Sequence, residues 1–212
     1  MQKVFAFCQQ DASAKEKNPY SDPAQIKPLI DKLRSIDAIQ CSEHELKVFM
    51  REAGGRVILD AGCGPGVHLE VFKKNKFKTI GIDASKLMVE EVRKNGYKAE
   101  RMQLQRLNFK DNTFHGIWCN AVLHHLDQNE VTDVLKQFKR VLKPSGLLFV
   151  SMKSLPNKRM DDFGREFCPM TKERLETLAG KAGFQTMRIY ERMGWIELFA
   201  YKLNGFSPLV QQ

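Results

Sequence analysis

Residues 57–66 constrain the fold of this chain more than any other stretch. They read VILDAGCGPG, an apolar run of strand-forming residues that ends in an acid and then breaks into three glycines at alternate positions. Such a pattern is typical of a buried strand that runs into a tight loop, with a helix behind it. Glycine lets the backbone adopt positive φ and lets a ligand approach the main chain closely. The stretch therefore predicts a loop that binds a nucleotide-like ligand.

The glycine spacing separates two kinds of cofactor site. The spacing is G-x-G-x-G, and Val67 stands where the dinucleotide motif G-x-G-x-x-G has its third glycine. This departure disfavours a nicotinamide cofactor. The stretch instead resembles the first motif of the class I S-adenosylmethionine (SAM) methyltransferases. Asp60, Gly62, Gly64 and Gly66 match that motif position by position.

The length of the chain bounds its organisation. Its 212 residues suffice for one α/β domain with a full core, whereas two domains would be cramped. We therefore expect a single domain over residues 1–212. Its parts are an N-terminal arm with lid helices (residues 1–55) and a Rossmann-like core (residues 56–212), and the core contains a substrate-binding insertion at about residues 153–170.

Composition and cysteine usage narrow the class of protein. No apolar run approaches the length of a membrane span, and the N-terminal apolar run at residues 4–8 is too short for a signal peptide. The five cysteines form an odd set without the spacing of a metal site. We therefore expect reduced thiols and a cytoplasmic protein, with no metal and no membrane partner. The sequence leaves the oligomeric state open.

The net charge of +9 is concentrated in one stretch. Residues 134–160 contain no acid. Their cations are Lys136, Lys139, Arg140, Lys143, Lys153, Lys158 and Arg159. A basic surface can attract nucleic acid or an anionic substrate. The alternative is a solvated face that keeps the protein soluble, and we favour that alternative.

Two helices are expected before the first strand. Asp22-Pro23 is typical of a helix cap followed by proline at the first helical position, and apolar residues then recur at helical spacing as far as Ile36. Pro28 either kinks this helix or marks its true start. The second helix opens at Ser42, where Ser42 and Glu45 form a predicted capping box.

Strands and helices alternate along the rest of the chain, which favours a parallel sheet, and a closing hairpin makes the last strand antiparallel. This is the pattern of the class I methyltransferases, a Rossmann-like seven-stranded sheet with helices on both faces, and the resemblance spans about residues 20–203. Strands are predicted from residue 57 and at residues 77–82, 97–102, 117–120, 147–152, 186–191 and 195–202, with turns at 143–146 and 193–194. Helices are predicted at residues 67–74 and after the caps Ser85, Asp127 and Thr171.

The tips of the predicted strands carry the cofactor candidates, because ligands of doubly wound sheets bind at the carboxyl ends of the strands. Asp83 follows Gly62 by 21 residues, and its carboxylate can accept both hydroxyls of a ribose. The alternative is a helix cap, a role that Ser85 can also fill. The resemblance implies that the methionine part of SAM lies at Asp60, Gly62 and Asn120. Gly64 and Ser85 are further candidates for binding the cofactor.

The resemblance also implies an adenine site. Gln103 and Leu104 stand where the family has an acid and the backbone N–H that follows it. A glutamine oxygen still accepts a hydrogen bond, although not a charge-assisted one. Met88 is a further candidate, with a place in the core as its alternative. An N-terminal aromatic residue often lies over the cofactor in such enzymes, and Tyr20 is the candidate, unless it is a solvent-facing loop residue.

The predicted chemistry needs few residues, because the methyl group of SAM is already activated and the main task is alignment. His124 is our first candidate for a general base, His125 the second and His115 the third, although each histidine has a structural alternative. Arg165 is the candidate for binding an anionic group of the substrate. A salt bridge to Asp161 or Asp162 is the alternative for that arginine.

These observations predict a SAM-dependent methyltransferase of the bacterial small-molecule type. It would transfer the methyl group by in-line displacement to a small, polar or anionic acceptor. One alternative is a methyltransferase of tRNA or another nucleic acid that uses the basic surface. A second alternative is a SAM-binding protein without catalytic activity.

Overall fold

The computed structural model of the protein describes residues 20, 22–35 and 42–203. Residues 1–19 of the predicted N-terminal arm, and Ile36 in the first predicted helix, lie outside the described residues. The strands are β1 (Val57–Ala61), β2 (Lys78–Asp83), β3 (Ala99–Arg101), β4 (Phe114–Asn120), β5 (Leu142–Lys153), β6 (Arg159–Met160), β7 (Glu166–Phe167), β8 (Phe184–Arg192) and β9 (Trp195–Lys202). The helices are α1 (Pro23–Leu33), α3 (Glu43–Glu52), α4 (Val67–Lys74), α5 (Lys86–Lys94), α6 (Gln128–Val141), α7 (Lys172–Lys181) and the 3₁₀ turn η1 (Leu123–His125).

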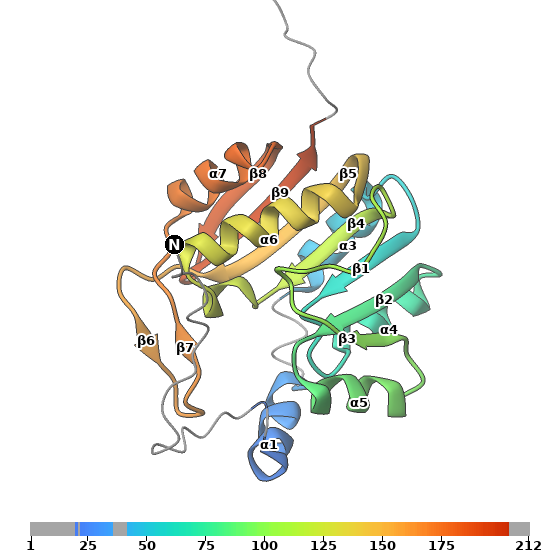
Figure 1. Ribbon diagram of the computed structural model, residues 1–212, viewed down its shortest axis with the longest axis vertical. Helices are drawn as coiled ribbons and strands as arrows, with labels where there is room; N and C mark the ends of the chain where they lie inside the picture. Colours follow the sequence, from blue (N-terminus) through green and yellow to red (C-terminus); the bar gives the residue numbers. More distant parts are fainter. Residues whose placement is uncertain (1–19, 21, 36–41, 204–212) are drawn as a thin grey trace, which may run out of the picture.

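Seven strands form one sheet in the order β3-β2-β1-β4-β5-β9-β8 (Figure 1). The pairs among β1 to β5 are parallel, whereas β9 is antiparallel to both β5 and β8. The predicted fold class is confirmed. The reversal follows from the turn between β8 and β9, where Met193 and Gly194 have φ of 51° and 73°. Two such residues make a turn whose twist suits a tight hairpin.

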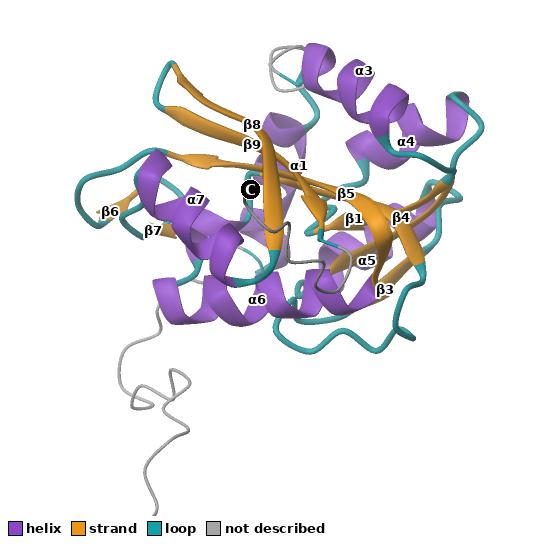
Figure 2. Cartoon of the chain, turned by 90° about the horizontal axis from the view of Figure 1, so that it is seen from above, coloured by secondary structure: helices purple, strands orange, loops and turns teal. Residues whose placement is uncertain are grey.

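Helices cover both faces of the sheet, with α3 and α4 on one side and α6 and α7 on the other (Figure 2). The core under α3 and α4 is aromatic. Trp118 of β4 stacks on Phe149 of β5 with ring centroids 4.0 Å apart, and Phe49 of α3 meets its edge at 5.3 Å. The opposite core is mostly aliphatic, with Val134, Leu135 and other residues of α6 against the sheet.

The glycine loop after β1 is fixed to the neighbouring strand. The backbone N–H groups of Gly62 and Cys63 both donate to the carbonyl oxygen of Ile82, at 2.8 and 2.9 Å. Gly62 has φ of +76°, and a Cβ there would overlap the side chain of Val122. Only glycine fits this position without strain. The helix behind the loop begins at Val67, as predicted.

The largest differences from the sequence prediction are at β5 and in the insertion, whereas β2, β3, β4 and β8 differ by one to three residues at their ends. Strand β5 runs from Leu142 rather than from Leu147, because residues 143–146 bulge out of the strand instead of preceding it. Phe114 pairs with Leu142 whereas Gly116 pairs with Leu147, and Ser145 in the bulge has φ of +58°. The predicted insertion at 153–170 also contains a small hairpin, β6–β7, that its sequence did not indicate.

The predicted capping box at α3 is wrong. Ser42 precedes the helix, but its φ and ψ of −116° and 6° are not those of an extended cap, and its side chain bonds to no helical N–H. The Ser42 hydroxyl instead contacts His68 Nε2 at 3.2 Å. By contrast, the box formed by Asp127 and Glu130 at the start of α6 is present.

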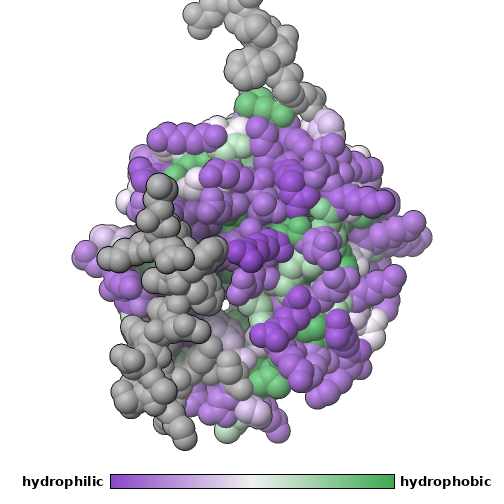
Figure 3. Space-filling model, viewed as in Figure 1, coloured by the Kyte–Doolittle hydropathy of each residue, from purple (hydrophilic) through white to green (hydrophobic). Residues whose placement is uncertain are grey.

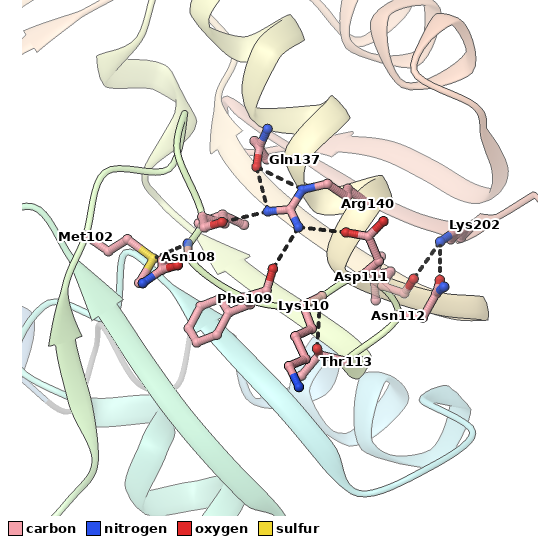
Figure 4. Close-up of polar contacts among 12 residues, drawn as sticks. Met102, Asn108, Phe109, Lys110, Asp111, Asn112, Thr113, Gln137, Arg140 and Lys202 are labelled. Carbon is pink, nitrogen blue, oxygen red and sulfur yellow. Dashed lines mark hydrogen bonds and ion pairs between the residues drawn. The ribbon is translucent and has the colours of Figure 1, made fainter.

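Three of the seven cations in the basic stretch from residue 134 to 160 pair with acids that lie outside the stretch. Arg140 of α6 donates to the carbonyl oxygens of Leu107 and Phe109 and to Asp111 Oδ1, at 2.6 to 2.8 Å (Figure 4). Further pairs join Lys136 to Asp133 and Lys158 to Glu166. The face shown in Figure 3 is nevertheless mostly hydrophilic, with only small apolar areas. These pairs support the solvated-face interpretation for much of the stretch.

Candidate functional site

A cavity of about 1830 Å³ lies at the carboxyl edge of the sheet. Its walls come from the glycine loop, from the ends of β2, β4, β5 and β9, and from α1, α3 and the β6–β7 hairpin. Helix α1 and the hairpin meet where Lys32 Nζ lies 4.9 Å above the Phe163 ring. The cavity is lined by most of the predicted site residues, namely Tyr20, Gly62, Gly64, Asp83, Ser85, Met88, Gln103, Leu104, Asn120, His124 and Arg165.

Asp83 joins the glycine loop to the turn after β2. Its Oδ2 accepts a hydrogen bond from the Gly64 N–H at 3.0 Å, and its Oδ1 accepts one from the Ser85 N–H at 2.8 Å. Burial raises the pKa of Asp83, although these two bonds oppose the rise. A carboxylate held by two N–H groups still has lone pairs that can accept from a ligand's hydroxyls.

Ser85 and Met88 have the structural roles that we weighed as alternatives, and both also line the cavity. The Ser85 hydroxyl accepts from the Met88 N–H at the start of α5, and it donates to the carbonyl oxygen of Tyr20 at 2.8 Å. Met88 is 1% exposed and packs with Ile26 and Leu29 of α1. These contacts hold Tyr20 and α1 against the start of α5 at the wall of the cavity.

Asp60 is not in the cavity wall, which corrects the prediction of a direct contact. It lies within β1, before that strand ends at Ala61, and its side chain is enclosed by protein with 1% exposed. Its Oδ2 has no hydrogen-bond partner. Burial, together with the charge of Asp83, raises the pKa of Asp60 to about 8.

His124 is buried, and both its hydrogen bonding and its pKa bear on its role. The ring Nδ1 accepts from the Lys153 N–H at 3.1 Å, and the ring stacks on Phe167. Burial lowers the pKa of His124 well below its usual value, and the neighbouring positive groups lower it further. The ring is therefore neutral with its proton on Nε2, and neither nitrogen has a free lone pair. This geometry speaks against a base role.

His125 has the opposite tautomer. Its Nδ1 lies 2.7 Å from the carbonyl oxygen of Glu166, and because a carbonyl only accepts, Nδ1 carries the proton. The lone pair is then on Nε2, which is 3.5 Å from the Tyr20 hydroxyl in the cavity wall. Burial lowers the pKa of His125, so the ring is neutral near pH 7.

His115, the third candidate, does not line the cavity. It lies near the start of β4, at the end of the strand away from Asn120. There its Nδ1 accepts from the Val57 N–H at 3.3 Å, and its Nε2 is 3.2 Å from Lys143 Nζ. The structure therefore excludes His115 from the chemistry of this site.

Arg165 lines the cavity and forms the salt bridge that was its alternative. Its guanidinium donates to Asp161 Oδ2 through Nη2 at 2.6 Å and through Nε at 2.7 Å, so that one carboxylate oxygen of the β6–β7 hairpin accepts both bonds. Arg165 also hydrogen-bonds the Tyr20 side chain. Its positive charge is thus already paired.

Several lining residues escaped the sequence analysis, among them Glu45, Ser151, Arg192, Trp195 and Glu197. One signal was available for Glu197, which is an acid between Ile196 and Leu198 in a strand predicted to be buried. A buried acid usually has a partner or a function. Glu45 gave no such signal because it fitted a capping box. Within the described residues, no group of His, Cys, Asp or Glu side chains could hold a metal ion.

Comparison with known proteins agrees with this geometry. Residues 59–150 match the family described as a methyltransferase domain. The human protein named "Probable tRNA methyltransferase 9B" is 31% identical over 105 residues, which are 49% of this chain and 23% of that protein. The chain spans about half or less of the length of the first curated relatives that it matches.

Crystal structures of other proteins resemble the fold, and two of them serve as examples. The PH0226 protein of Pyrococcus horikoshii has a TM-score of 0.70 and 22% identity, over 81% of this chain and 93% of its own. An S-adenosylmethionine-dependent methyltransferase of Mesorhizobium loti has a TM-score of 0.65 and 16% identity, over 76% of this chain and 97% of its own. The sheet order and the glycine loop define a Rossmann-like methyltransferase fold. Residues 59–150 thus match a methyltransferase domain, and the fold is that of the SAM-dependent methyltransferases.

SAM is the cofactor of this family, and the residues of the cavity fit it. The glycine loop presents main chain without side chains, and Asp83 offers lone pairs for hydroxyls at the next strand tip. Gln103 and Leu104 follow along the same edge. No helix among the described residues has the length and apolar character needed to cross a membrane. The three described cysteines, Cys63, Cys119 and Cys168, are free thiols.

Proposed function

We propose that this domain transfers a methyl group from SAM to a small polar acceptor in the cavity. The proposal rests on Asp83, whose carboxylate accepts hydrogen bonds from the glycine loop and from the β2–α5 turn. Asp83 lines the cavity of about 1830 Å³, which is large enough for a cofactor. SAM supplies an activated methyl group, so the tasks of the protein are alignment and exclusion of water. We also retain the prediction of a cytoplasmic location.

The cofactor contacts follow the order of the strand tips. Asp83 would accept the ribose hydroxyls, and Gln103 with Leu104 would contact the adenine. Asn120 and the loop at Gly62 would contact the methionine part. Tyr20, held by the Ser85 hydroxyl through its carbonyl oxygen, would cover the cofactor.

His125 is the base that the hydrogen bonds favour. Its Nε2 faces the cavity, where an acceptor hydroxyl or ammonium group would replace the weak contact with the Tyr20 hydroxyl at 3.5 Å and give up its proton, while the Glu166 carbonyl fixes the ring through Nδ1. His124, our first candidate from the sequence, has its Nδ1 lone pair occupied by the Lys153 N–H. Binding of an anionic group by Arg165 stays a prediction, and such a group would compete with Asp161.

Isothermal titration of SAM tests the proposal. We expect wild-type protein to bind SAM, and Asp83→Asn to bind it at least about tenfold more weakly, since hydrogen bonds to a charged group contribute about 1.5–3 kcal/mol. Asp133→Asn on the exposed side of α6 is the matched control and should bind SAM as the wild type does. An absence of SAM binding by the wild type would reject the proposal.

The second candidate is methylation of tRNA, and it rests on the human relative named as a tRNA methyltransferase. Transfer of radiolabelled methyl from SAM to bulk tRNA or to a small-molecule extract, measured side by side, distinguishes the two acceptors. Label in the tRNA fraction alone would favour this candidate. Label in the small-molecule fraction alone would remove it.

A further inference from the structure

One row of polar residues crosses four strands at the carboxyl edge of the sheet. Asn120 of β4 pairs with Ser151 of β5, Ser151 pairs with Glu197 of β9, and Glu197 pairs with Tyr190 of β8. Paired residues point to the same face of a sheet. Two residues deeper on that face, the strands carry aromatic core residues such as Trp118. The row is therefore a polar rim on an aromatic core.

A second carboxyl group meets this row from above. Glu45 of α3 accepts a hydrogen bond from the Tyr190 hydroxyl at 3.1 Å, through Oε1. Arg192 Nη2 lies 3.3 Å from the same oxygen and 4.0 Å from Glu197 Oε2. Helix α3 and the end of the β8–β9 hairpin thus bring two carboxyl groups together beside the cavity, which both residues line.

The carboxyl groups of Glu45 and Glu197 lack part of their hydrogen bonds and of their balancing positive charge. Glu45 is 1% exposed and Glu197 is 7% exposed, yet Oε2 of each has no hydrogen-bond partner. A buried acceptor left unpaired is destabilising, because it has lost its bonds to water without replacement. The nearby guanidinium of Arg192 is 57% exposed, so a single screened cation serves two buried carboxyl groups. Burial and the charge of Glu45 raise the pKa of Glu197.

The pair lies beside the predicted reaction centre. Neighbouring strands are about 4.8 Å apart, so two strand spacings, or roughly 10 Å, separate Asn120 from Glu197 along the row. Ser151 lies between them and also lines the cavity. A small acceptor whose reactive atom lies near Asn120 would therefore reach the carboxyl pair with its other end.

We infer that Glu45 and Glu197 form a subsite for a cationic nitrogen, an ammonium or amidinium group, of the methyl acceptor. Such a group brings the N–H donors and the positive charge that the two Oε2 atoms lack. The inference rests on the proposed function for the role of its ligand. It assigns a charge to the acceptor opposite to the one that Arg165 alone suggested.

Other cations in the cavity wall lie on different elements from this subsite. The Lys153 ammonium lies 4.2 Å above the Trp195 ring, and Arg159 is exposed on the hairpin. The Arg165–Asp161 pair belongs to that hairpin too, whereas the subsite belongs to α3 and β9. The two walls would contact different parts of one acceptor.

Calorimetric titration with three small probes tests the subsite. Benzylamine, benzyl alcohol and benzoate have the same ring and carry a positive, a zero and a negative charge at pH 7. We expect benzylamine to bind the wild type at least about tenfold more tightly than the alcohol, and benzoate to bind most weakly. Glu45→Gln and Glu197→Gln should each remove most of this selectivity. Glu176→Gln, an exposed acid on α7, is the matched control and should retain it.

Two results would overturn the subsite. One is equal binding of benzylamine and benzyl alcohol by the wild type, and the other is unchanged selectivity in both glutamine variants with unaltered melting temperatures. The same wild-type sample is titrated with SAM. SAM binding without selectivity for the amine rejects the subsite alone, whereas selectivity without SAM binding rejects the proposed function. If a single variant unfolds, the double variant Glu45→Gln/Glu197→Gln, which removes both carboxylates together, replaces it.

Discussion

Two adjacent histidines in the η1 turn carry their lone pairs on different ring nitrogens. The sequence treats His124 and His125 alike, and each is a plausible base by residue type. The Lys153 N–H donates to Nδ1 of the first, whereas the Glu166 carbonyl oxygen accepts a hydrogen bond from the protonated Nδ1 of the second. A single hydrogen bond to each ring therefore decides which histidine can accept a proton at Nε2.

This assignment predicts opposite tautomers that can be observed without an acceptor. Long-range ¹H–¹⁵N correlation spectra at pH 7 should show the proton of His125 on Nδ1 and that of His124 on Nε2. His125→Gln assigns the signals and should lower methyl transfer by at least about 100-fold, the lower range for loss of a general base, while SAM affinity stays unchanged. The same tautomer in both rings would contradict the assignment.

His68 predicts a pH-dependent stability. Burial lowers its pKa from 6.5 to about 4, so the unfolded chain binds a proton at His68 before the folded protein does. The stability that His68 contributes is complete above pH 6.5 and is lost as the pH falls toward 4, by at most about 3 kcal/mol. The pKa of Asp60 is raised to about 8, so its contribution to stability increases as the pH falls, opposite to that of His68.

The measurement is therefore a difference between two proteins. Urea unfolding of wild type and His68→Gln at pH 7 and pH 4.5 cancels the contribution of Asp60. We expect the stability of the wild type relative to the variant to decrease on acidification. A difference that is constant between the two pH values would show that His68 titrates alike in the folded and unfolded states.

At the scale of elements, Arg140 joins α6 to the loop that precedes β4. Its guanidinium reaches Leu107, Phe109 and Asp111, all about 30 residues away in the sequence (Figure 4). In the sequence this residue belonged to a basic run that suggested a surface for anions. In the fold it holds carbonyl groups of a segment that lacks regular structure.

Arg140→Met should therefore lower the free energy of unfolding by about 2–4 kcal/mol, because it leaves carbonyl groups of the loop without their donors. Urea unfolding measures the loss. Lys136→Met, which removes an exposed pair with Asp133 on the same helix, is the control and should change stability by less than about 1 kcal/mol. Equal effects of the two substitutions would disprove the structural role of Arg140.

At the scale of the whole molecule, α1 connects the N-terminal segment to the cofactor edge. Arg34 at the end of α1 donates to the Pro65 carbonyl of the glycine loop at 3.0 Å, and it pairs with Glu91 of α5 at 2.9 Å. The Ser85 hydroxyl adds its bond to the Tyr20 carbonyl oxygen. These three contacts support the proposal that α1 acts as a lid over the predicted cofactor position.

Arg34→Gln should loosen this lid more than it destabilises the fold. We expect SAM affinity to fall about three- to tenfold, since contacts to a loop carbonyl and to an acid contribute about 1 kcal/mol together in a half-exposed setting. Calorimetry and the melting temperature measure the two effects. Lys47→Gln, from an exposed pair with Glu43 on α3, is the control. Unchanged SAM affinity in Arg34→Gln would argue against the lid.

The sequence by itself determined the fold class, the glycine loop and most of the cavity edge. Strand periodicity, the glycine spacing and the caps at Ser85, Asp127 and Thr171 are local patterns, and backbone sterics and nearby hydrogen bonds enforce them over a few residues. Strand tips in a parallel sheet then come together at one edge. Gly62, Asp83 and Asn120 could be placed there for that reason.

The tertiary structure alone decided the partners of the charged and titratable side chains. Tyr190 reaches Glu45 across 145 residues, and Tyr20 lies beside His125 across 105 residues. No local pattern contains such contacts, because chain topology sets them and burial then changes the charge and tautomer of the groups that meet. The glycine loop therefore predicted a cofactor from the sequence alone. The charge that we propose for the acceptor rests on tertiary contacts between α3 and β9.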